Sequence, residues 1–279
     1  MILVLDIGGT KTRLSSSTSY PNLGEIVVFD TLKNFDDEVK EITSRAKIIL
    51  NGNPDASVGA GKLDGVVVGI AGVFDEKKET LLISPNLKEW EGLPIKKMFK
   101  EAFGAPVSLE NDAALAGLGE AVLGAGKGSE IVAYITVGTG VGGARIVGGK
   151  IDKRRFGFEP GHQILDVGGR DLEYYVSGKS LGVRYEKKPE EITDTKIWDE
   201  VEGWLAVGVH NSILHWSPDI VVLGGSMVLK EPGISTSNVS EKLGKILKTF
   251  KVAPKITVVS LGDSAGLYGG LILSEQMHK

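Results

Sequence analysis

The chain of 279 residues contains no cysteine, so disulfide bonds and thiolate-bound metals are excluded. No apolar run reaches the roughly 18 residues of a membrane-spanning helix. The first apolar stretch has no basic segment before it and is interrupted early by Asp6, which argues against a secretory signal. The net charge is a modest −4, because 36 Asp and Glu residues stand against 32 Lys and Arg residues. We therefore expect a cytoplasmic protein that binds neither membranes nor nucleic acid.

The sequence is long enough for two compact lobes, and its pattern predicts an α/β fold. We expect strands at residues 1–5, 11–16, 25–31, 63–70, 106–109, 131–137, 144–147, 220–223 and 255–260. Helices are expected at 36–50, 95–103, 112–123, 171–181, 198–216, 240–250 and 265–278, with a polar, mobile loop at 231–239. The order of elements in the first half is echoed after residue 130. This echo predicts an N-terminal lobe of residues 1–110, on which the last helix (265–279) packs back, and a C-terminal lobe of residues 111–264.

Two glycine-rich blocks follow predicted strands and are the most informative feature of the chain. The first consists of Asp6 and then Gly8, Gly9, Thr10, Lys11 and Thr12, and the second contains Gly138, Thr139, Gly140 and Gly142. Glycine lets backbone N–H groups approach phosphate oxygens, and a carboxylate at a strand end can face the accompanying cation. Two such loops predict a nucleotide-binding phosphoryl-transfer enzyme, although either loop alone could be a structural hairpin turn.

Two other phosphate-binding patterns fit less well. Residues 138–143 match the dinucleotide fingerprint, which requires a helix directly afterwards, but a strand and a hairpin turn are predicted there. Residues 178–180 resemble the end of a Walker A loop, but Glu173 stands where the leading glycine should be. A strand–turn–strand phosphate hairpin suits both glycine blocks better.

Asn111 and Asp112 stand between a predicted strand and a predicted helix. Such a pair can cap the helix, and Asp112 can also accept the proton of a substrate hydroxyl. We expect the helix N-terminus to keep this carboxylate ionised, which makes it a weak base. A weak base suffices where proton transfer is late, as in a loose phosphoryl-transfer transition state. Capping and catalysis are compatible.

Two further groups of residues complete the candidate site. Glu159, His162 and Glu173 carry the polar groups that bind vicinal sugar hydroxyls, although a surface loop would explain the first two equally simply. Gly224, Gly225 and Ser226 follow an apolar strand, where backbone could pass closely over adenine or simply turn. His210 and His215 are five residues apart on one predicted helix, a spacing that does not suit a metal pair.

Together these blocks resemble the ROK family of sugar kinases and repressors over nearly the whole chain, notably at residues 6–13, 84–90, 107–114, 136–143, 159–162 and 221–226. The resemblance implies a two-lobed actin-like ATPase (ribonuclease H-like) fold that binds nucleotide and sugar in the interlobe cleft. It implies that Asp112 is the general base, that Asn111, Gly72, Glu159, His162 and Glu173 bind the sugar, and that Asp6 positions Mg²⁺ through water. The glycine blocks would hold the phosphates of ATP, residues 224–226 would lie near its adenosine, and a homodimer is expected.

One segment departs from the family. Many members follow the Glu-x-Gly-His motif with a three-cysteine zinc loop, whereas residues 163–172 here are shorter and carry no cysteine. One Asp cannot replace three thiolates, so no structural zinc is expected. Packing and hydrogen bonds must order the loop after His162 instead.

The resemblance implies ATP-dependent phosphorylation of the primary (6-) hydroxyl of a hexose, with glucose first and fructose, mannose or an N-acetylhexosamine as alternatives. A sugar-responsive regulator is a second hypothesis, less favoured because the chain begins directly with the first phosphate strand. A third is an actin-like ATPase without a sugar substrate, against which Asn111, Asp112, Glu159 and His162 argue.

Overall fold

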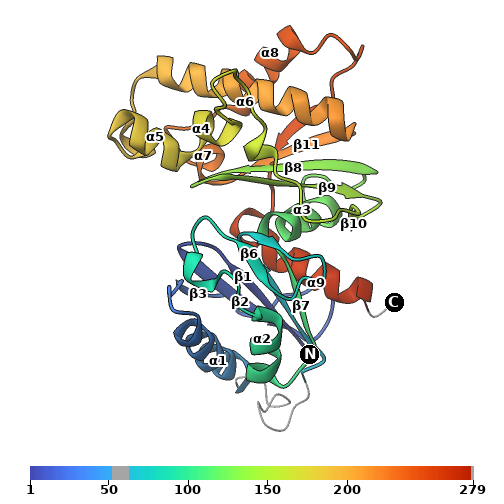
Figure 1. Cartoon of the computed structure of the whole chain (residues 1–279). Coiled ribbons are helices and arrows are strands. Elements are labelled where there is room, and N and C mark those ends of the chain that lie inside the picture. Colours follow the sequence, from blue (N-terminus) through green and yellow to red (C-terminus); the bar gives the residue numbers. More distant parts are fainter. Residues whose placement is uncertain (52–62, 278–279) are drawn as a thin grey trace. The chain divides into compact units, whose positions relative to one another are not determined.

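The computed structural model of the protein describes residues 1–51 and 63–277, and its contacts divide the chain into two compact units. Unit 1 comprises Met1–Gly119, Lys153–Gly157 and Asp263–Lys279, and unit 2 comprises Glu120–Asp152 and Phe158–Gly262. Each unit is built on a five-stranded sheet with its own helices (Figure 1). The division differs from the predicted lobes, because Asn111, Asp112 and the residues up to Gly119 belong to unit 1.

Unit 1 has a mixed sheet in the order β3-β2-β1-β4-β7. Its strands are β1 (Ile2–Ile7), β2 (Lys11–Ser17), β3 (Val27–Asp30), β4 (Gly65–Ile70) and β7 (Val107–Asn111), beside a small hairpin of β5 (Val73–Phe74) and β6 (Leu81–Ile83). Its helices are α1 (Phe35–Asn51), η1 (Lys88–Trp90), α2 (Ile95–Phe103), the first part of α3 (Asp112–Val122), η4 (Gly262–Ser264) and α9 (Ala265–Met277). Strands β1, β2 and β3 are antiparallel neighbours, whereas β1, β4 and β7 run parallel.

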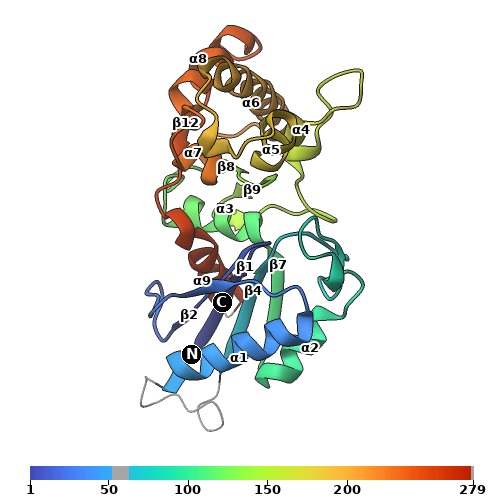
Figure 2. The same cartoon turned by 90° about the vertical axis from the view of Figure 1, so that its left-hand side faces the viewer.

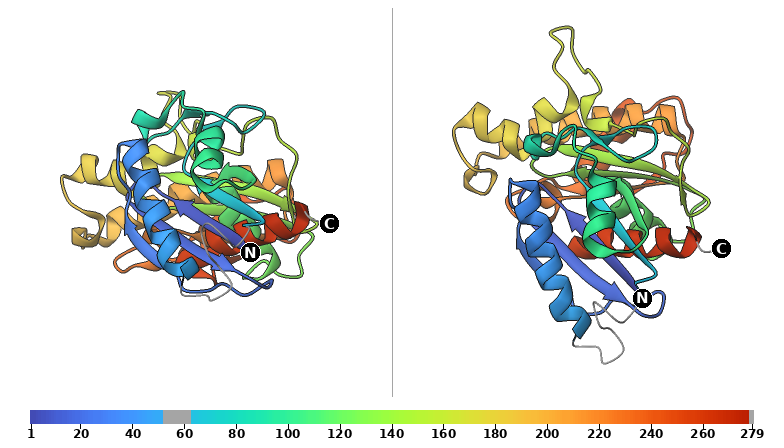
Figure 3. Two further views of the ribbon diagram at one scale, coloured as in Figure 1. Left: turned by 90° about the horizontal axis from the view of Figure 1, so that it is seen from below. Right: turned by 60° about the horizontal axis from the view of Figure 1, so that its bottom comes forward.

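Alternation along β1 assigns its side chains to two faces of the sheet. Leu3 and Leu5 belong to the core that α1 and α2 cover. Val4 lies on the other face, against Gly270 of α9. Figures 2 and 3 show α1 (blue) on one side of these strands and α9 (red) on the other. Asp6 shares the α9 face, so the carboxylate lies beside the start of that helix.

The parallel strands of unit 1 bring their carboxyl ends to one edge of the sheet. Asp6 pairs in register with Gly69 of β4, and Ile70 pairs with Asn111 of β7. Ligands of open α/β sheets bind outside the carboxyl ends of the strands. The fold therefore gathers Asp6, Asn111 and the residues that follow them at the edge where a substrate would bind.

Unit 2 has a sheet in the order β10-β9-β8-β11-β12, built from β8 (Ile131–Val137), β9 (Val141–Val147), β10 (Lys150–Ile151), β11 (Ile220–Gly224) and β12 (Lys255–Val258). Its helical elements are η2 (Pro160–His162), α4 (Leu172–Val176), α5 (Gly178–Tyr185), η3 (Pro189–Glu191), α6 (Thr195–Trp216), α7 (Ser226–Leu229) and α8 (Thr236–Ile246). Ile135 and Leu223 of the sheet share one core with α4, α6 and α8. This core supports the β8–β9 turn from one side.

The structure differs from the sequence-based expectations in three elements of unit 2. The expected mobile loop at 231–239 is wrong in its second half, because α8 begins at Thr236 and buries Val239. The expected helix at 171–181 is two helices that meet at Ser177. The strand expected from residue 144 already begins at Val141. The residues expected to end the first helix, after residue 51, lie outside the described residues. The predicted end of the last helix at residue 278 lies outside them too.

Candidate active site

The first glycine block forms the turn between β1 and β2 in unit 1. Gly8 N donates to Lys11 O at 3.0 Å and closes the turn. A Cβ on Gly9 would lie 2.4 Å from the side chain of Asn86, so only glycine fits there. Lys11 pairs with Asp30 on β3, at 2.6 Å between Nζ and Oδ1. The expected strand–turn–strand hairpin is confirmed.

Thr12 turns its side chain into the core, so only its backbone is left for the expected contact with phosphate. The residue is fully buried, and its hydroxyl donates to Glu38 Oε1 at 2.5 Å. The other oxygen of Glu38 accepts from the backbone N of Leu32, and the Thr31 hydroxyl donates to Gly8 O at 2.9 Å. Burial raises the pKa of Glu38 above its ordinary value. Thr12 therefore braces the turn from the core side.

Asp6 lies at the end of β1 in a poorly hydrated position. Its carboxylate is 3.8 Å from the guanidinium of Arg13, which also binds Asp263 at 3.0 Å. The pKa of Asp6 is raised to about 7, chiefly by burial and then by the negative charge of Asp112, while the nearby Arg13 partly offsets both. A carboxylate held next to another carboxylate in this way favours a cation between or beside the two groups.

Asn111 caps α3 and also binds the turn after β4. Its side-chain oxygen accepts from Ala114 N at 3.0 Å, and its side-chain nitrogen donates to Gly72 O at 3.1 Å. Gly72 has a φ of +149°, and a Cβ there would lie 2.5 Å from the carbonyl oxygen of Ile83. The predicted pair of Asn111 and Gly72 is thus brought together, and each residue fixes the other.

Asp112 follows at the first position of α3, where its Oδ1 accepts from Ala113 N at 2.8 Å. We expected the helix N-terminus to keep this carboxylate ionised and weakly basic. In the structure, burial raises the pKa of Asp112 above its ordinary value, and the bond from Ala113 N only partly offsets this. Asp112 is therefore a stronger base than the sequence indicated.

The second glycine block forms the β8–β9 turn in unit 2, and the predicted adenosine turn lies next to it. A Cβ on Gly225, whose φ is +88°, would lie 2.3 Å from Val137 O, and a Cβ on Gly138 would lie 3.6 Å from the hydroxyl of Ser226. Gly178 N at the start of α5 donates to Gly138 O at 2.8 Å. These segments line a pocket of about 210 Å³ whose lining residues include Thr139, Lys179, Glu190, Ser226, Met227 and Lys230.

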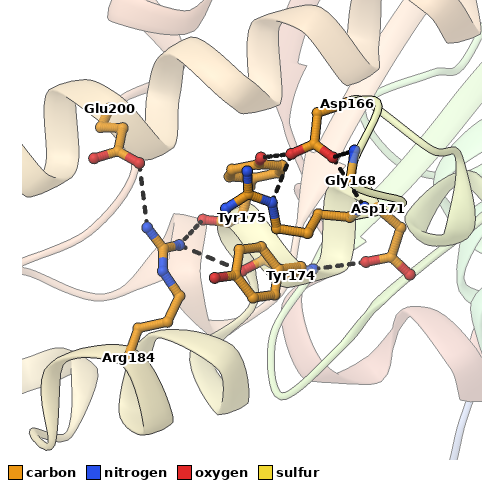
Figure 4. Close-up of polar contacts among 8 residues, drawn as sticks. Asp166, Gly168, Asp171, Tyr174, Tyr175, Arg184 and Glu200 are labelled. Atoms are coloured by element: carbon orange, nitrogen blue, oxygen red, sulfur yellow. Dashed lines mark hydrogen bonds and ion pairs between the residues drawn. The ribbon is translucent and has the colours of Figure 1, made fainter.

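The predicted sugar-binding residues of unit 2 gather on the other side of the β8–β9 turn. His162 ends η2, and its Nδ1 lies 2.9 Å from Asp171 Oδ2, a bond that raises the pKa of the imidazole. Glu173 Oε2 accepts from Val141 N at 2.7 Å, so its carboxylate is tied to the phosphate turn. Glu159 is exposed at the start of η2, where its carbonyl accepts from His162 N. Figure 4 shows the α4 region that carries Asp171.

The family resemblance suggests two metals, Mg²⁺ and zinc, and the donor atoms present show whether each one fits. Mg²⁺ is usually held by one or two carboxylates together with substrate phosphates, and Asp6 and Asp112 in unit 1 fit that role. Zinc does not fit residues 163–171, because they offer no thiolate, and the carboxylate of Asp166 is already bound by Arg170 and Tyr175. Among residues 1–51 and 63–277, no cluster of three or more His, Cys, Asp or Glu side chains could hold a metal ion.

Several residues at these sites were not predicted as site residues. Arg13 could have been found from strand register, because a short turn pairs it with Asp6. Lys179 was set aside with the Walker A pattern, although it lies beside the phosphate turn. Lys33 contacts the first turn, since its Nζ is 2.9 Å from Asn86 O and 3.4 Å from Gly9 O, and no local sequence signal marks it.

Comparison with known proteins places this geometry in a family. The sequence profile of the ROK family matches residues 3–277. A glucokinase of Streptomyces coelicolor is 26% identical, with 98% of this chain and 96% of the relative covered. The xylose repressor of Bacillus subtilis is 24% identical, with 87% of this chain and 70% of the repressor covered.

Among solved structures, a ROK glucokinase from Streptomyces griseus, in complex with glucose and AMPPNP, superimposes with a TM-score of 0.80. It is 25% identical, and 99% of each chain is covered. Within residues 1–51 and 63–277, no helix is both long and apolar enough to cross a membrane. The chain belongs to the ROK family and has the α/β actin-like ATPase fold of its sugar kinases.

Proposed function

We propose that the protein is an ATP-dependent kinase that transfers the γ-phosphate of ATP to the primary hydroxyl of a hexose, with glucose as the first candidate. The observation that carries this proposal is Asp112, a carboxylate with a raised pKa that begins a helix at the carboxyl edge of the sheet. Asn111 beside it is fixed to Gly72, as a residue that orients a substrate must be. The family membership and the glucose complex of the S. griseus relative support the choice of a sugar.

Unit 1 would supply the base and the acidic end of the nucleotide site. Asp112 would accept the proton of the attacking hydroxyl, and its raised pKa improves proton transfer near neutral pH. The backbone of Gly8, Gly9 and Thr10 would face phosphate oxygens. Mg²⁺, when bound at Asp6, neutralises charge on the phosphates. Arg13 would hold Asp6 in place through the contact between their side chains.

Unit 2 would supply its own contacts to ATP and to the sugar. The β8–β9 turn would hold phosphates, and the neighbouring pocket with Ser226 would hold the adenosine. Because His162 Nδ1 is bound to Asp171, its Nε2 is the ring atom that can face a sugar hydroxyl. Glu173 has one oxygen on Val141 N and would use its other oxygen for the sugar, which links sugar binding to the phosphate turn. We retain the expectation of a homodimer as part of this proposal.

The test is a coupled assay of ADP release with ATP and Mg²⁺ across glucose, fructose, mannose, galactose, N-acetylglucosamine and N-acetylmannosamine. We expect turnover on at least one sugar, abolished in Asp112→Asn while sugar binding by calorimetry persists. Asp37→Asn is the matched control, because Asp37 is an exposed carboxylate on α1 that pairs with Lys40. Near-normal turnover in Asp112→Asn would refute the catalytic role of this residue.

The same assay separates the two alternative functions. A sugar-responsive regulator is favoured by the similarity to the xylose repressor, and it would bind a sugar without phosphorylating any. An ATPase without a sugar substrate would release ADP at a rate that no sugar changes. Either result would replace the kinase proposal.

A further inference from the structure

The loop between η2 and α4 is cross-linked by one carboxylate. Asp166 Oδ1 accepts from Gly168 N at 2.8 Å and from Arg170 N at 3.2 Å. Asp166 Oδ2 accepts from Arg170 Nε at 2.6 Å and from the hydroxyl of Tyr175 (Figure 4). We call Asp166, Arg170 and Tyr175 the loop clamp. The clamp closes the hairpin of residues 165–170 and ties it to α4, because Tyr175 lies on that helix.

The clamp is anchored in the core of unit 2. The ring of Tyr175 stacks on Trp204 of α6, with centroids 3.9 Å apart and an angle of 20° between the planes. Tyr175 is only 5% exposed, and the Asp166 side chain is 17% exposed. The guanidinium of Arg170 lies over the same tyrosine ring at 5.6 Å. One side-chain partner of the carboxylate, Tyr175, is therefore held in the core, while the other, Arg170, is half exposed.

Helix α4 depends on such contacts because a helix of five residues has no stability of its own. Asp171 caps its start by accepting from Tyr174 N at 2.8 Å. Arg184 binds its end by donating to Tyr174 O at 3.3 Å and Tyr175 O at 3.2 Å, and it also pairs with Glu200 (Figure 4). Its side chains Leu172 and Val176 are buried in the core of unit 2, and the loop clamp adds a polar contact to the loop.

Two residues of the proposed sugar site depend on where α4 lies. The capping residue Asp171 also orients His162 through its second oxygen. Glu173 lies on the helix itself and reaches Val141 N of the β8–β9 turn. A shift of α4 would thus move the imidazole and the carboxylate together, and a displacement of about 1 Å can reduce an enzyme's efficiency about a hundredfold.

We propose that Asp166 is a positioning residue for sugar recognition: through Arg170 and Tyr175 it fixes α4, and thereby sets the orientation of His162 and Glu173. This inference rests on the proposed function for the role of His162 and Glu173. The clamp orders the loop through hydrogen bonds to Asp166, in a segment where the donors do not fit zinc. Asp166 touches neither substrate in this scheme and acts only through the loop and the helix.

The first variant is Asp166→Asn. The amide oxygen of Asn can still accept from Gly168 N and Arg170 N, but its amide nitrogen cannot accept from Arg170 Nε or Tyr175. We expect the KM for the sugar to rise about tenfold, with the KM for ATP unchanged and kcat little affected. Asp199→Asn is the matched control, since Asp199 is an exposed acid paired with Lys242 elsewhere in unit 2.

The second variant, Tyr175→Phe, removes only the hydroxyl and keeps the ring stacked on Trp204. Because both substitutions break the bond between Asp166 and Tyr175, the double variant should cost less than the two single effects combined. This variant also keeps the test valid if Asp166→Asn folds poorly. If the rise in the sugar KM of the double variant equals the product of the rises in the two single variants, Asp166 and Tyr175 act independently. That result would overturn the clamp.

A readout without turnover separates this inference from the proposed function. Hydrogen exchange should become faster at the amides of residues 165–175 in Asp166→Asn, and the pKa of His162 measured by NMR should fall towards its ordinary value. If the wild type phosphorylates no sugar, the proposed function fails and these two measurements alone decide the clamp. Unchanged exchange and unchanged His162 pKa would overturn the clamp in an active kinase too. Faster exchange without any change in the KM for an accepted sugar would show that the clamp is structural only.

Discussion

The raised pKa of Asp6 predicts that Asp6→Asn stabilises the protein while destroying its activity. The substitution keeps the shape of the side chain but removes its ability to ionise. The Asp6 side chain is 16% exposed and faces the charge of Asp112, with only Arg13 at 3.8 Å in compensation. In the wild type, the folded state bears the free-energy cost of desolvating an ionised carboxylate, and the unfolded state does not. Asparagine carries no charge, so the variant avoids this cost.

The magnitude and sign follow from proton linkage. A pKa raised from 3.8 to about 7 corresponds, at about 1.4 kcal/mol for each pH unit, to at most about 4 kcal/mol. Below the unfolded-state pKa the carboxyl group is protonated in both states and costs nothing. As the pH rises towards 7, the unfolded state releases the proton first, so the stability of the wild type falls. The advantage of Asp6→Asn should therefore grow from roughly 2 kcal/mol near pH 5 to roughly 4 kcal/mol near pH 7.

The assay is urea unfolding of both proteins between about pH 5 and pH 8, without nucleotide and with a chelator. Added Mg²⁺ should stabilise the wild type more than the variant, since the variant keeps only Asp112 of the two carboxylates. Asp30→Asn is the control, because Asp30 is 77% exposed and its loss should change the stability by less than about 0.5 kcal/mol. A stability difference that stays constant across this pH range would refute a raised pKa at Asp6.

Two further predictions concern unit 1. Because Asp112 must be ionised to accept a proton, kcat/KM should fall as the pH drops through a value above the usual range for Asp; a profile that stays flat down to about pH 4 would contradict this. Glu38→Ala should destabilise the protein by about 2–4 kcal/mol, because it leaves the buried hydroxyl of Thr12 and the N–H of Leu32 without their acceptor. Urea unfolding beside the exposed control Glu41→Ala measures this, and equal stability of the two variants would show that water replaces the carboxylate.

Local patterns in the sequence predict most of the fold. The helix at 95–103 and the strand at 131–137 are correct to the residue, because clear apolar periods end at Gly104 and at the second glycine block. Both glycine blocks are hairpin turns, as expected. In each case the deciding signal lies within a few residues, which is the range over which propensity and pattern act.

The start of α8 could not be predicted because its decisive partner is far away in the sequence. Residues 235–238 are polar and are typical of a loop. Glu202 on α6 accepts from the backbone N of Ser235 at 2.9 Å and from the side chain of Asn238 at 3.0 Å. Glu202 is itself only 3% exposed. These bonds, together with the burial of Val239, turn a polar segment into the first turn of a helix.

For Thr12, by contrast, the direction of the side chain could have been predicted from the sequence. The glycine-rich motif drew attention away from the strand pattern. Residues alternate between faces along a strand, so Thr12 and Leu14 share the core side of β2 while Lys11 and Arg13 share the other. The glycine-rich block suggested that each of its polar residues meets phosphate. Strand alternation shows that a contiguous motif in a hairpin divides its side chains between ligand and core.

The direction of the pKa shift of Asp112 depends on whether burial or the helix N-terminus has the larger effect. The sequence alone does not give the extent of burial. A helix N-terminus favours a carboxylate by about 0.3–1 kcal/mol, rising to about 2 kcal/mol in favourable geometries, whereas burial can shift a pKa by up to about 3–5 units. Only the structure shows that Asp112 is partly buried, that desolvation is the largest cause of its raised pKa, and that its side chain accepts from Ala113 N. Burial therefore outweighs the helix end. The same site holds Asp6, whose pKa Asp112 raises, so a cation bound there would stabilise both ionised carboxylates and lower the pKa of Asp112. The base would then be strongest before the metal–nucleotide complex binds, and the pH dependence of kcat should lie at lower pH than that of kcat/KM.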